Sequence, residues 1–226
     1  MGIEHRTFEY SAEDGTVFEG FLALPKERND PLPGVLVYHA FRGVGDFEKE
    51  RAKELAKLGF AALAADVYGK GKRGSSFEEC FAVMRPFMED RPSVEGVDGN
   101  RIGAMGYCFG GLCALDLARH KVGLKAAVSF HGTLKPLDGA ALEHFDTAIQ
   151  VHHGDADDHI NPFVPAFQQE MRDRKADWQF SNYGKAMHGF TEPEADKLGK
   201  PGLAYNKEAD TRSWSAATAL FKEKLM

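Results

Sequence analysis

The sequence predicts an α/β fold in which a mainly parallel sheet is covered by helices on both faces, with an antiparallel hairpin at its N-terminal end. Short apolar segments alternate with amphipathic ones along the chain, a pattern typical of parallel strands joined by crossover helices. Two early segments flank a turn signal, as the strands of a hairpin do. The 226 residues are 43% hydrophobic and 27% charged, which suits a globular protein with a sizeable core.

The hairpin is expected from residues 6–11 and 16–25, which flank the turn signal Ala-Glu-Asp-Gly at 12–15. Six later segments are expected as strands. The first two are apolar almost throughout, as strands buried on both faces are. The six segments are residues 35–40, 60–69, 101–107, 125–132, 148–154 and 178–184.

Five segments between and after these strands are expected as helices. They are residues 46–59, 75–90, 110–120, 161–174 and 207–225. The first places leucines among charges and closes on Gly59, a residue suited to a helix C-cap. Pro86 is expected to bend or end the second helix, and Pro162 fits the first turn of the fourth. No repeat, low-complexity segment or linker divides the chain, so we expect a single domain spanning residues 1–226.

Composition and charge exclude several classes of protein. The net charge of −6 argues against a nucleic-acid partner or an anionic membrane surface, and the basic segment Gly69–Gly74 reads as a solvated loop. No signal-peptide core opens the chain and no stretch reaches transmembrane length, so a cytoplasmic location is expected. Cys80, Cys108 and Cys113 are an odd set without CxxC spacing, which argues against a disulfide framework or a cysteine zinc site.

The segment Gly106–Gly111, Gly-Tyr-Cys-Phe-Gly-Gly, joins an expected strand to an expected helix. A nucleophile in such a turn needs small neighbours because its backbone is sharply turned and strained. The turn would present Cys108 at the sheet edge and aim the N–H of Phe109 at a developing oxyanion. The following helix would favour a thiolate through its positive dipole end.

Two other interpretations of this turn remain open from these residues alone. A cysteine is among the most frequently buried residue types, so Cys108 is also compatible with a small core side chain. A dinucleotide-binding loop also joins a strand to a helix, but the glycine spacing here does not fit that fingerprint.

A second polar cluster, residues 152–162, follows another expected strand. Asp157 and Asp158 stand where an acid could orient a histidine. The alternative is that the aspartates of this segment only turn the chain and cap the next helix. A metal site is also conceivable, but His152 and His153 are adjacent on a strand and should point to opposite faces.

A third polar loop, Gly184–Phe190, contains His188 after the last expected strand. Taken alone, a loop histidine is most often a surface residue. The order along the chain changes this interpretation: nucleophile at Cys108, acid at Asp157 and histidine at His188 is the order of the α/β-hydrolase fold. All three lie at expected carboxyl ends of strands, where the functional loops of such sheets gather.

These motifs make the sequence resemble the dienelactone hydrolase family of α/β-hydrolases over nearly its whole length. The segments that carry the resemblance are VLVYHAFRG, LAKLGFAALAADVYGKG, NRIGAMGYCFGG, HHGDADDHINP and YGKAMHGF. The resemblance implies Cys108 as nucleophile, His188 as base and Asp157 as the orienting acid, because the family places that acid three residues after a glycine. It also implies an oxyanion hole formed by the backbone N–H groups of Phe109 and Phe41.

The sequence departs from the family pattern at two places. Members related to the dienelactone enzyme often carry a glutamate directly after the VLVYH-like strand, where it influences thiol ionisation, and Ala40 stands there in this chain. They also carry an arginine after the HGF-like turn that helps bind the substrate carboxylate, and here Thr191 and Glu192 follow. An acidic residue would repel that carboxylate, so a neutral, aromatic or alkyl ester or lactone is the expected substrate.

The expected mechanism is acyl transfer through Cys108, with no cofactor or metal required. Ala40, Arg42, Tyr68, Phe190 and Glu192 are the expected substrate-binding residues. Phe41 and Phe109 would add aromatic walls to the pocket, whereas Tyr107 is expected to point into the core. The expected partner is the small-molecule substrate, and the chain would act as a monomer or homodimer.

Activated thioesters or phosphotriesters are conceivable side substrates of a thiolate. Two rival functions stay open: a thiol-based redox sensor using Cys108, and a hydrolase-like ligand-binding protein without turnover. The sensor predicts sulfenic acid and no burst with an activated ester, and the binding protein predicts ligand binding unaffected by His188→Ala.

Overall fold

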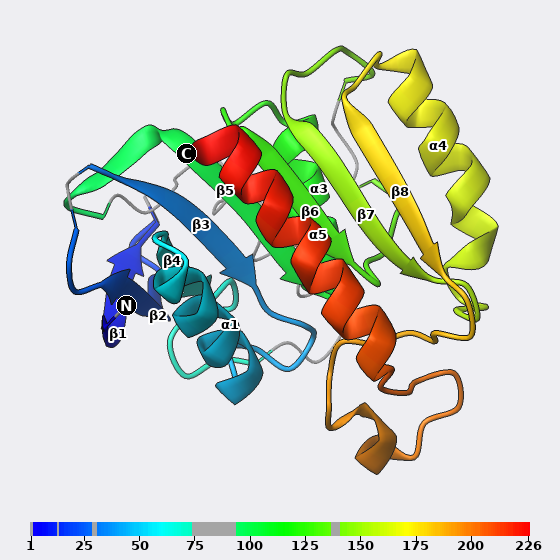
Figure 1. The fold of residues 1–226 in the computed structure, drawn as a ribbon, viewed down its shortest axis with the longest axis horizontal. Helices are drawn as coiled ribbons and strands as arrows, with labels where there is room; N and C mark the ends of the chain where they lie inside the picture. Colours follow the sequence, from blue (N-terminus) through cyan, green and yellow to red (C-terminus); the bar gives the residue numbers. More distant parts are fainter. Residues whose placement is uncertain (1, 13, 29–30, 74–93, 137–140) are drawn as a thin grey trace.

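The computed structural model describes residues 2–12, 14–28, 31–73, 94–136 and 141–226. Its strands form one sheet of eight strands in the order β1-β2-β4-β3-β5-β6-β7-β8 (Figure 1). The strands are β1 (Ile3–Ser11), β2 (Val17–Pro25), β3 (Leu32–Tyr38), β4 (Ala61–Ala65), β5 (Val97–Tyr107), β6 (Ala126–Phe130), β7 (Ala148–Gly154) and β8 (Trp178–Tyr183). The helices are α1 (Asp46–Lys57), α3 (Phe109–Arg119), α4 (Val164–Asp173), α5 (Lys207–Leu225) and the short 3-10 helices η1 (Asn161–Phe163) and η2 (Ala195–Leu198).

The pairing of the strands confirms the predicted mixture of parallel and antiparallel neighbours. Strands β1 and β2 form an antiparallel hairpin in which Ile3 pairs with Pro25 and Ser11 with Val17. Strand β2 also runs antiparallel to β4. All the remaining pairs, from β4 through β3 and β5 to β8, are parallel.

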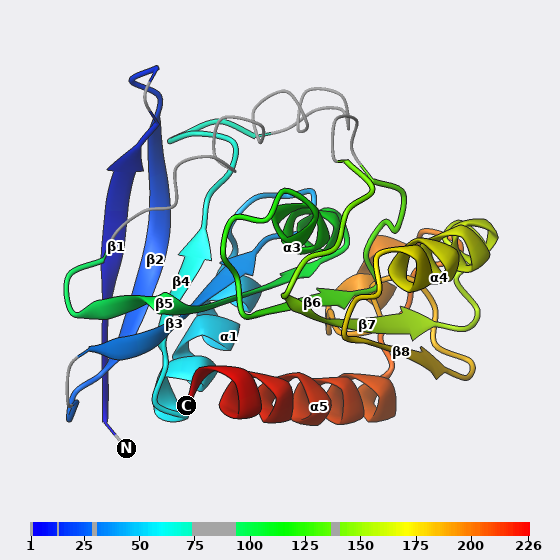
Figure 2. The same cartoon turned by 90° about the horizontal axis from the view of Figure 1, so that it is seen from above.

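Helices cover both faces of this sheet, which confirms the predicted layers. Helices α1 and α5 lie on one face, and α3 and α4 on the other (Figure 2). The two faces bury separate apolar clusters, one containing Leu55 of α1 and Phe221 of α5, the other Leu117 of α3 and Phe167 of α4. Burial of these apolar faces is the main favourable contribution to folding.

Strand position explains which segments are apolar. Every residue of β3, β4, β6 and β7 is buried, as expected for parallel strands between two helical layers. The edge strand β1 has no buried residue; its residues are half-buried or exposed. The expected helix at 75–90, with Cys80, lies outside the described residues.

The carboxyl ends of the parallel strands point to one edge of the sheet. Cys108 follows β5, the aspartates of the second cluster follow β7, and the loop after β8 contains His188. Three segments far apart in sequence therefore meet at this edge. Within the described ranges, no helix is long and apolar enough to cross a bilayer.

Candidate active site

The turn between β5 and α3, residues 106–111, is called the nucleophile turn below. Cys108 stands at its apex with φ 53° and ψ −110°, a backbone conformation that non-glycine residues adopt at an energetic cost. The Cys108 N–H donates to the Phe130 carbonyl at 3.0 Å, which ties the apex to the end of β6. The cysteine is partly exposed, whereas every residue of α3 behind it is buried.

Glycines flank the cysteine because the backbone there leaves no space for side chains. A Cβ on Gly106 would stand 2.0 Å from the Gly110 carbonyl oxygen, and a Cβ on Gly110 would stand 2.3 Å from the Tyr38 carbonyl oxygen. Contacts below 3.0 Å are sterically forbidden for real Cβ atoms. The first turn of α3 can therefore press against the ends of β3 and β5 only with glycine at both positions, which fixes Cys108 at the sheet edge.

His188 lies in the long segment between β8 and α5, residues 184–206, called the histidine loop below. Its backbone is pinned from both sides: the His188 N–H donates to the Gly202 carbonyl at 3.1 Å, and the Ala204 N–H donates to the His188 carbonyl at 3.2 Å. The same loop therefore supplies the imidazole and holds it in place.

Asp157 accepts a hydrogen bond from Nδ1–H of His188, with 2.7 Å between Nδ1 and Oδ2. The Asp157 side chain is fully buried, and its Oδ1 accepts from the Ile160 N–H at 3.3 Å. Asp158 is exposed instead. The structure thus pairs His188 with the aspartate that the sequence analysis preferred.

The ionisation of His188 depends on two neighbours. Burial by itself would lower the pKa of this imidazole, but the charge of Cys108 and the hydrogen bond to Asp157 outweigh it and raise the pKa to about 10. An imidazolium between a carboxylate and a sulfur atom is the arrangement that activates a thiol for nucleophilic attack.

Sequence reasoning did not identify His131, which packs against the catalytic candidates. Its ring meets the His188 ring edge-on at 5.3 Å between centroids, and its Nε2 lies 2.8 Å from the Thr191 hydroxyl. His131 is fully buried and has φ 40°, while its Nδ1 has no hydrogen-bond partner among the described atoms. Burial, with the nearby His188 charge, keeps its pKa well below the usual value, so His131 is a neutral support. The signal available in the sequence was a histidine near the carboxyl end of the expected strand 125–132.

The loop after β3 is shaped by a second neutral histidine. Nε2 of His39 accepts from the Val67 N–H at 3.3 Å, so its Nδ1 carries the proton and donates to the Ala40 carbonyl at 2.7 Å. Burial lowers the pKa of His39 to about 4. The Tyr68 hydroxyl donates to the Phe41 carbonyl at 2.9 Å. These bonds fix the backbone around Phe41, one of the two residues expected to line an oxyanion hole.

A pocket of about 590 Å³ opens at Cys108 and His188. Among the expected substrate-binding residues it contains Ala40, Arg42 and Glu192, and Phe41 also lines it. Its further apolar walls come from Phe47 of α1 and from the histidine loop, through Leu198 and Leu203. This volume is in the range of small-molecule sites.

Tyr68 and Phe190, which were expected to contact substrate, are not among the residues that line this pocket. Tyr68 is buried and its ring stacks on Phe109. Phe190 is fully buried against His131 and Tyr183. Both aromatics support the residues that shape the site. Tyr107 is buried as expected.

Glu48 is a pocket residue that the sequence analysis missed. This side chain of α1 is 95% buried. Its Oε2 accepts from the Gly45 N–H at 2.8 Å and its Oε1 from the Ala40 N–H at 3.4 Å. The Glu48 carboxylate, which comes from α1, therefore lies beside Ala40. Ala40 stands where related enzymes often carry a glutamate in the strand-end loop itself. The signal available in the sequence was a glutamate three residues after the first helix's N-cap, a position from which it can reach back to the cap's N–H.

The two strand histidines of the second cluster hold structure, whereas His159 is exposed and lines the pocket. His152 bonds to Tyr183 and Gln150, whereas His153 bonds to Asn161, so their side chains separate as expected. In the part of the chain that the structure describes, no group of three or more His, Cys, Asp and Glu side chains is placed to hold a metal ion. Cys113 is buried in α3.

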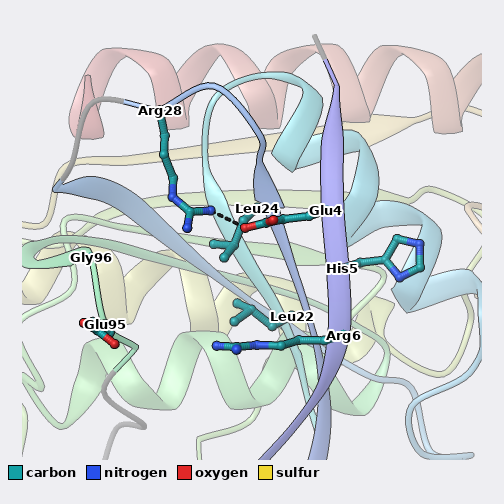
Figure 3. Close-up of a pocket in the computed structure, with 8 residues that line it drawn as sticks. All are labelled: Glu4, His5, Arg6, Leu22, Leu24, Arg28, Glu95 and Gly96. Atoms are coloured by element: carbon teal, nitrogen blue, oxygen red, sulfur yellow. Dashed lines mark hydrogen bonds and ion pairs between the residues drawn. The ribbon is translucent and has the colours of Figure 1, made fainter.

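A second pocket, of about 390 Å³, lies beside the N-terminal hairpin (Figure 3). An ion pair between Arg28 and Glu4 joins two of its residues, with 2.5 Å between Nη1 and Oε1. Arg6 lies beside Leu22 in the same view. None of the described residues that line this pocket is a nucleophile, so the chemistry of the molecule is expected at the first pocket.

Comparison with known proteins connects this geometry to a family. Residues 18–225 match the model of the "Dienelactone hydrolase family". An uncharacterized Caenorhabditis elegans protein, K02A2.1, is 49% identical over 134 residues, which cover 58% of this chain and 85% of that protein. A Bradyrhizobium protein named "Probable 2-oxo-3-(5-oxofuran-2-ylidene)propanoate lactonase" is 29% identical over 210 residues, 81% of each chain.

A solved structure is similar over the full length of both chains. It is a dienelactone hydrolase-like promiscuous phosphotriesterase from metagenomic libraries, with 33% sequence identity and a TM-score of 0.91. The similarity covers 100% of this chain and 100% of that one. The fold predicted from the sequence, that of an α/β-hydrolase, is thereby confirmed.

Proposed function

Since this chain belongs to the dienelactone hydrolase family and hydrolyses ester bonds, we propose that it does so through Cys108 as a covalent nucleophile. The observation that carries this proposal is the combination of a strained cysteine at the apex of the nucleophile turn with the 2.7 Å bond between His188 and Asp157. Strain of this kind persists in a fold where the surrounding structure enforces it, as at nucleophiles.

In the acylation step, His188 holds the proton of Cys108 and the thiolate attacks the ester carbonyl carbon. The carbonyl oxygen becomes an oxyanion, stabilised by the backbone N–H groups of Phe109 and Phe41. When the tetrahedral intermediate collapses, the carbon–oxygen bond to the alcohol breaks and His188 gives its proton to the departing oxygen. The acyl group is then bound to Cys108 as a thioester.

In the deacylation step, the imidazole of His188 takes a proton from water and the resulting hydroxide attacks the thioester. The sulfur leaves as a thiolate, the acid is released, and the proton on His188 restores the starting pair. Asp157 stays ionised throughout, holding the imidazole in the tautomer that directs Nε2 toward the reacting atoms. No atom or electron is needed beyond those of water and the ester.

The substrates we propose are neutral alkyl or aromatic esters and lactones. The apolar walls of the pocket, Phe41, Phe47, Leu198 and Leu203, favour an alkyl or aromatic portion next to the ester. Activated thioesters and phosphotriesters are proposed as side substrates, which fits the similar structure described as a promiscuous phosphotriesterase. A thiolate can attack phosphorus as it attacks a carbonyl carbon, with the oxyanion donors facing the phosphoryl oxygen.

The test is stopped-flow hydrolysis of p-nitrophenyl acetate, butyrate and benzoate. We expect a burst of nitrophenolate close to one equivalent per Cys108, followed by slower turnover. Cys108→Ala should lose turnover by a factor of about 10³ or more. Cys113→Ala is the matched control, because Cys113 is buried on the same helix away from the pocket, and it should keep both burst and turnover.

Two results would contradict the proposal. Turnover of all three esters in Cys108→Ala at the wild-type rate would remove the cysteine from the mechanism. Absence of both burst and turnover in the wild type, with peroxide converting Cys108 to sulfenic acid, would instead favour a thiol-based redox sensor.

A further inference from the structure

Two carboxyl groups share the pocket of the nucleophile. Glu48 reaches it from α1 and Glu192 from the histidine loop, and both line the same space as Cys108 and His188. Any ester that Cys108 attacks must occupy that space, so both carboxyl groups face bound substrate at short range.

Glu48 is the fixed member of the two. It is 95% buried, and its two oxygens accept from the Gly45 and Ala40 N–H groups. Burial raises its pKa, while these hydrogen bonds oppose the increase. The side chain cannot turn away from the pocket without breaking both of these part-buried hydrogen bonds, which would be costly.

Glu192 is the member that remains available to a ligand. Its side chain is half-buried, and within the described ranges its carboxyl group makes no hydrogen bond or ion pair. Burial and the nearby Glu48 raise its pKa to about 7, although His188 and Arg42 act in the opposite direction. Arg42 is exposed and no ion pair joins it to Glu192 among the described residues.

Building on the ester hydrolysis proposed above, we propose that Glu192, backed by Glu48, is a specificity-determining residue that selects substrates carrying a cationic group and excludes those carrying a carboxylate. An ammonium group seated between the two carboxyl groups would supply the partner that Glu192 lacks in the structure. A substrate carboxylate in the same place would face two like charges in a partly desolvated pocket, where repulsion is stronger than in water.

The other charged groups around the pocket do not cancel the negative charges of Glu48 and Glu192. Arg42 and Lys200 line it but both are exposed, so solvent screens their charges. Asp46 and Glu194 also line it, are exposed, and carry the opposite sign. The positive charge of His188 is paired with the Asp157 carboxylate, with 2.7 Å between Nδ1 and Oδ2, and His159, which also lines the pocket, is exposed. The buried or half-buried charges that remain unbalanced are those of Glu48 and Glu192.

The direct test uses charged thiol reagents, so it does not depend on ester hydrolysis. Cys108 is treated at pH 8 with the cationic 2-(trimethylammonio)ethyl and the anionic 2-sulfonatoethyl methanethiosulfonates. Each reagent forms a mixed disulfide with the thiolate and releases methanesulfinate. Mass spectrometry of the Cys108 peptide gives the rate constant for each reagent. The ratio of the cationic to the anionic rate constant is then divided by the same ratio measured for free 2-mercaptoethanol.

We expect this normalised ratio to be about tenfold or more in favour of the cationic reagent in the wild type. Glu192→Gln, which keeps the shape of the side chain, should reduce it about threefold or more, and Glu192→Lys should bring it below one. Glu27→Gln is the matched control: Glu27 is exposed just after β2, outside the pocket, so the same loss of one charge should leave the ratio unchanged. A wild-type ratio near one, or one that Glu192→Gln does not change, would overturn the proposal.

A second test asks the same question in turnover, with p-nitrophenyl esters of 4-(trimethylammonio)butyrate, of its uncharged isostere 5,5-dimethylhexanoate, and of adipate as the monoanion. We expect the order cationic, neutral, anionic in kcat/KM, with the difference between the first two lost in Glu192→Gln. The two proposals fail separately. Hydrolysis of the neutral ester with no charge preference would overturn the charge selection alone. A tenfold reagent ratio without hydrolysis of any ester would support the charge selection and contradict the ester hydrolysis.

Discussion

At the nucleophile turn the backbone leaves no room for a side chain on Gly106 or Gly110, whereas nothing lies within 4 Å of the place where a Cβ on Gly184, at the start of the histidine loop, would stand. The first segment is fixed by steric contact between main-chain atoms. The second is held by a few hydrogen bonds, such as those of His188 to Gly202 and Ala204. The same site therefore combines a turn with almost no sequence freedom and a loop that has open positions, such as Gly184, where a side chain can be added.

This division has a functional consequence. The nucleophile turn sets where the reacting sulfur stands, which every substrate requires. The histidine loop supplies His188 and also several pocket walls, among them Glu192, Leu198 and Leu203. Changes in the first segment should therefore abolish folding or chemistry, whereas changes at the pocket walls of the second, Glu192, Leu198 and Leu203, should redirect specificity.

The largest effect should come from adding one methyl group to the nucleophile turn. Gly106→Ala would place a Cβ 2.0 Å from the Gly110 carbonyl oxygen, which only a shift of α3 could relieve. We expect a loss of more than about 3 kcal/mol of stability, and hence a fall in Tm of more than about 6 °C or no folded protein. Gly184→Ala makes the same change where space is open, and its Tm should stay within about 2 °C of the wild type. Equal melting temperatures for the two variants would contradict the comparison.

The next effect should separate the two neighbouring aspartates after β7. Asp157→Asn removes one of the two groups that raise the pKa of His188, so that pKa should fall from about 10, by about one unit or more. The kcat should fall about 10³- to 10⁴-fold. An NMR titration of the His188 ring and the ester assay measure the two effects. Asp158→Asn changes an exposed carboxylate and should alter neither the pKa of His188 nor kcat. A decrease of either value in Asp158→Asn would contradict the assignment of the orienting role to Asp157.

The smallest effect concerns stability and pH. The pKa of Glu192, about 7 in the folded state, lies above the value near 4.3 of an unfolded chain, so the folded protein binds this proton more tightly. Its contribution to stability is present at low pH and is lost as the pH rises through 7. Glu192→Gln should therefore melt less than about 1 °C above the wild type at pH 5 and about 2 to 4 °C above it at pH 8.5, roughly 1 kcal/mol after allowing for exposure.

Thermal melts at the two pH values measure this difference. Glu27→Gln, at an exposed position, should show the same Tm as the wild type at both. A stabilisation of Glu192→Gln that is the same at pH 5 and pH 8.5 would show that the carboxyl group does not titrate in this range.

The same division decides how much could be predicted from the sequence. The strands, the helices α1, α3, α4 and α5 and the hairpin follow from periodicity and turn signals, whereas η2 was not expected. The glycines around Cys108 indicate the geometry of the nucleophile turn. The pairing of His188 with Asp157 was expected from the order of the residues along the chain and from the family resemblance, since both follow parallel strands that end at one edge.

Side-chain direction in the loops could not be predicted in this way. Phe190 was expected to face substrate, but Gly189 has φ 69° and the turn that it makes sends the ring into the core against His131. Glu48 was expected only as part of an amphipathic helix, because nothing in its local sequence indicates that its oxygens meet the Ala40 N–H. Such contacts depend on how separate elements pack, which a local pattern does not contain.

The most direct measurement is tandem mass spectrometry of enzyme quenched within milliseconds of mixing with p-nitrophenyl butyrate. Trypsin leaves Cys108 and Cys113 on one peptide, residues 102–119, so fragment ions between the two cysteines locate the added mass. We expect a butyryl group on Cys108 alone, formed in the burst and lost at the steady-state rate. Full wild-type turnover with no acyl group on Cys108 at any time would contradict it.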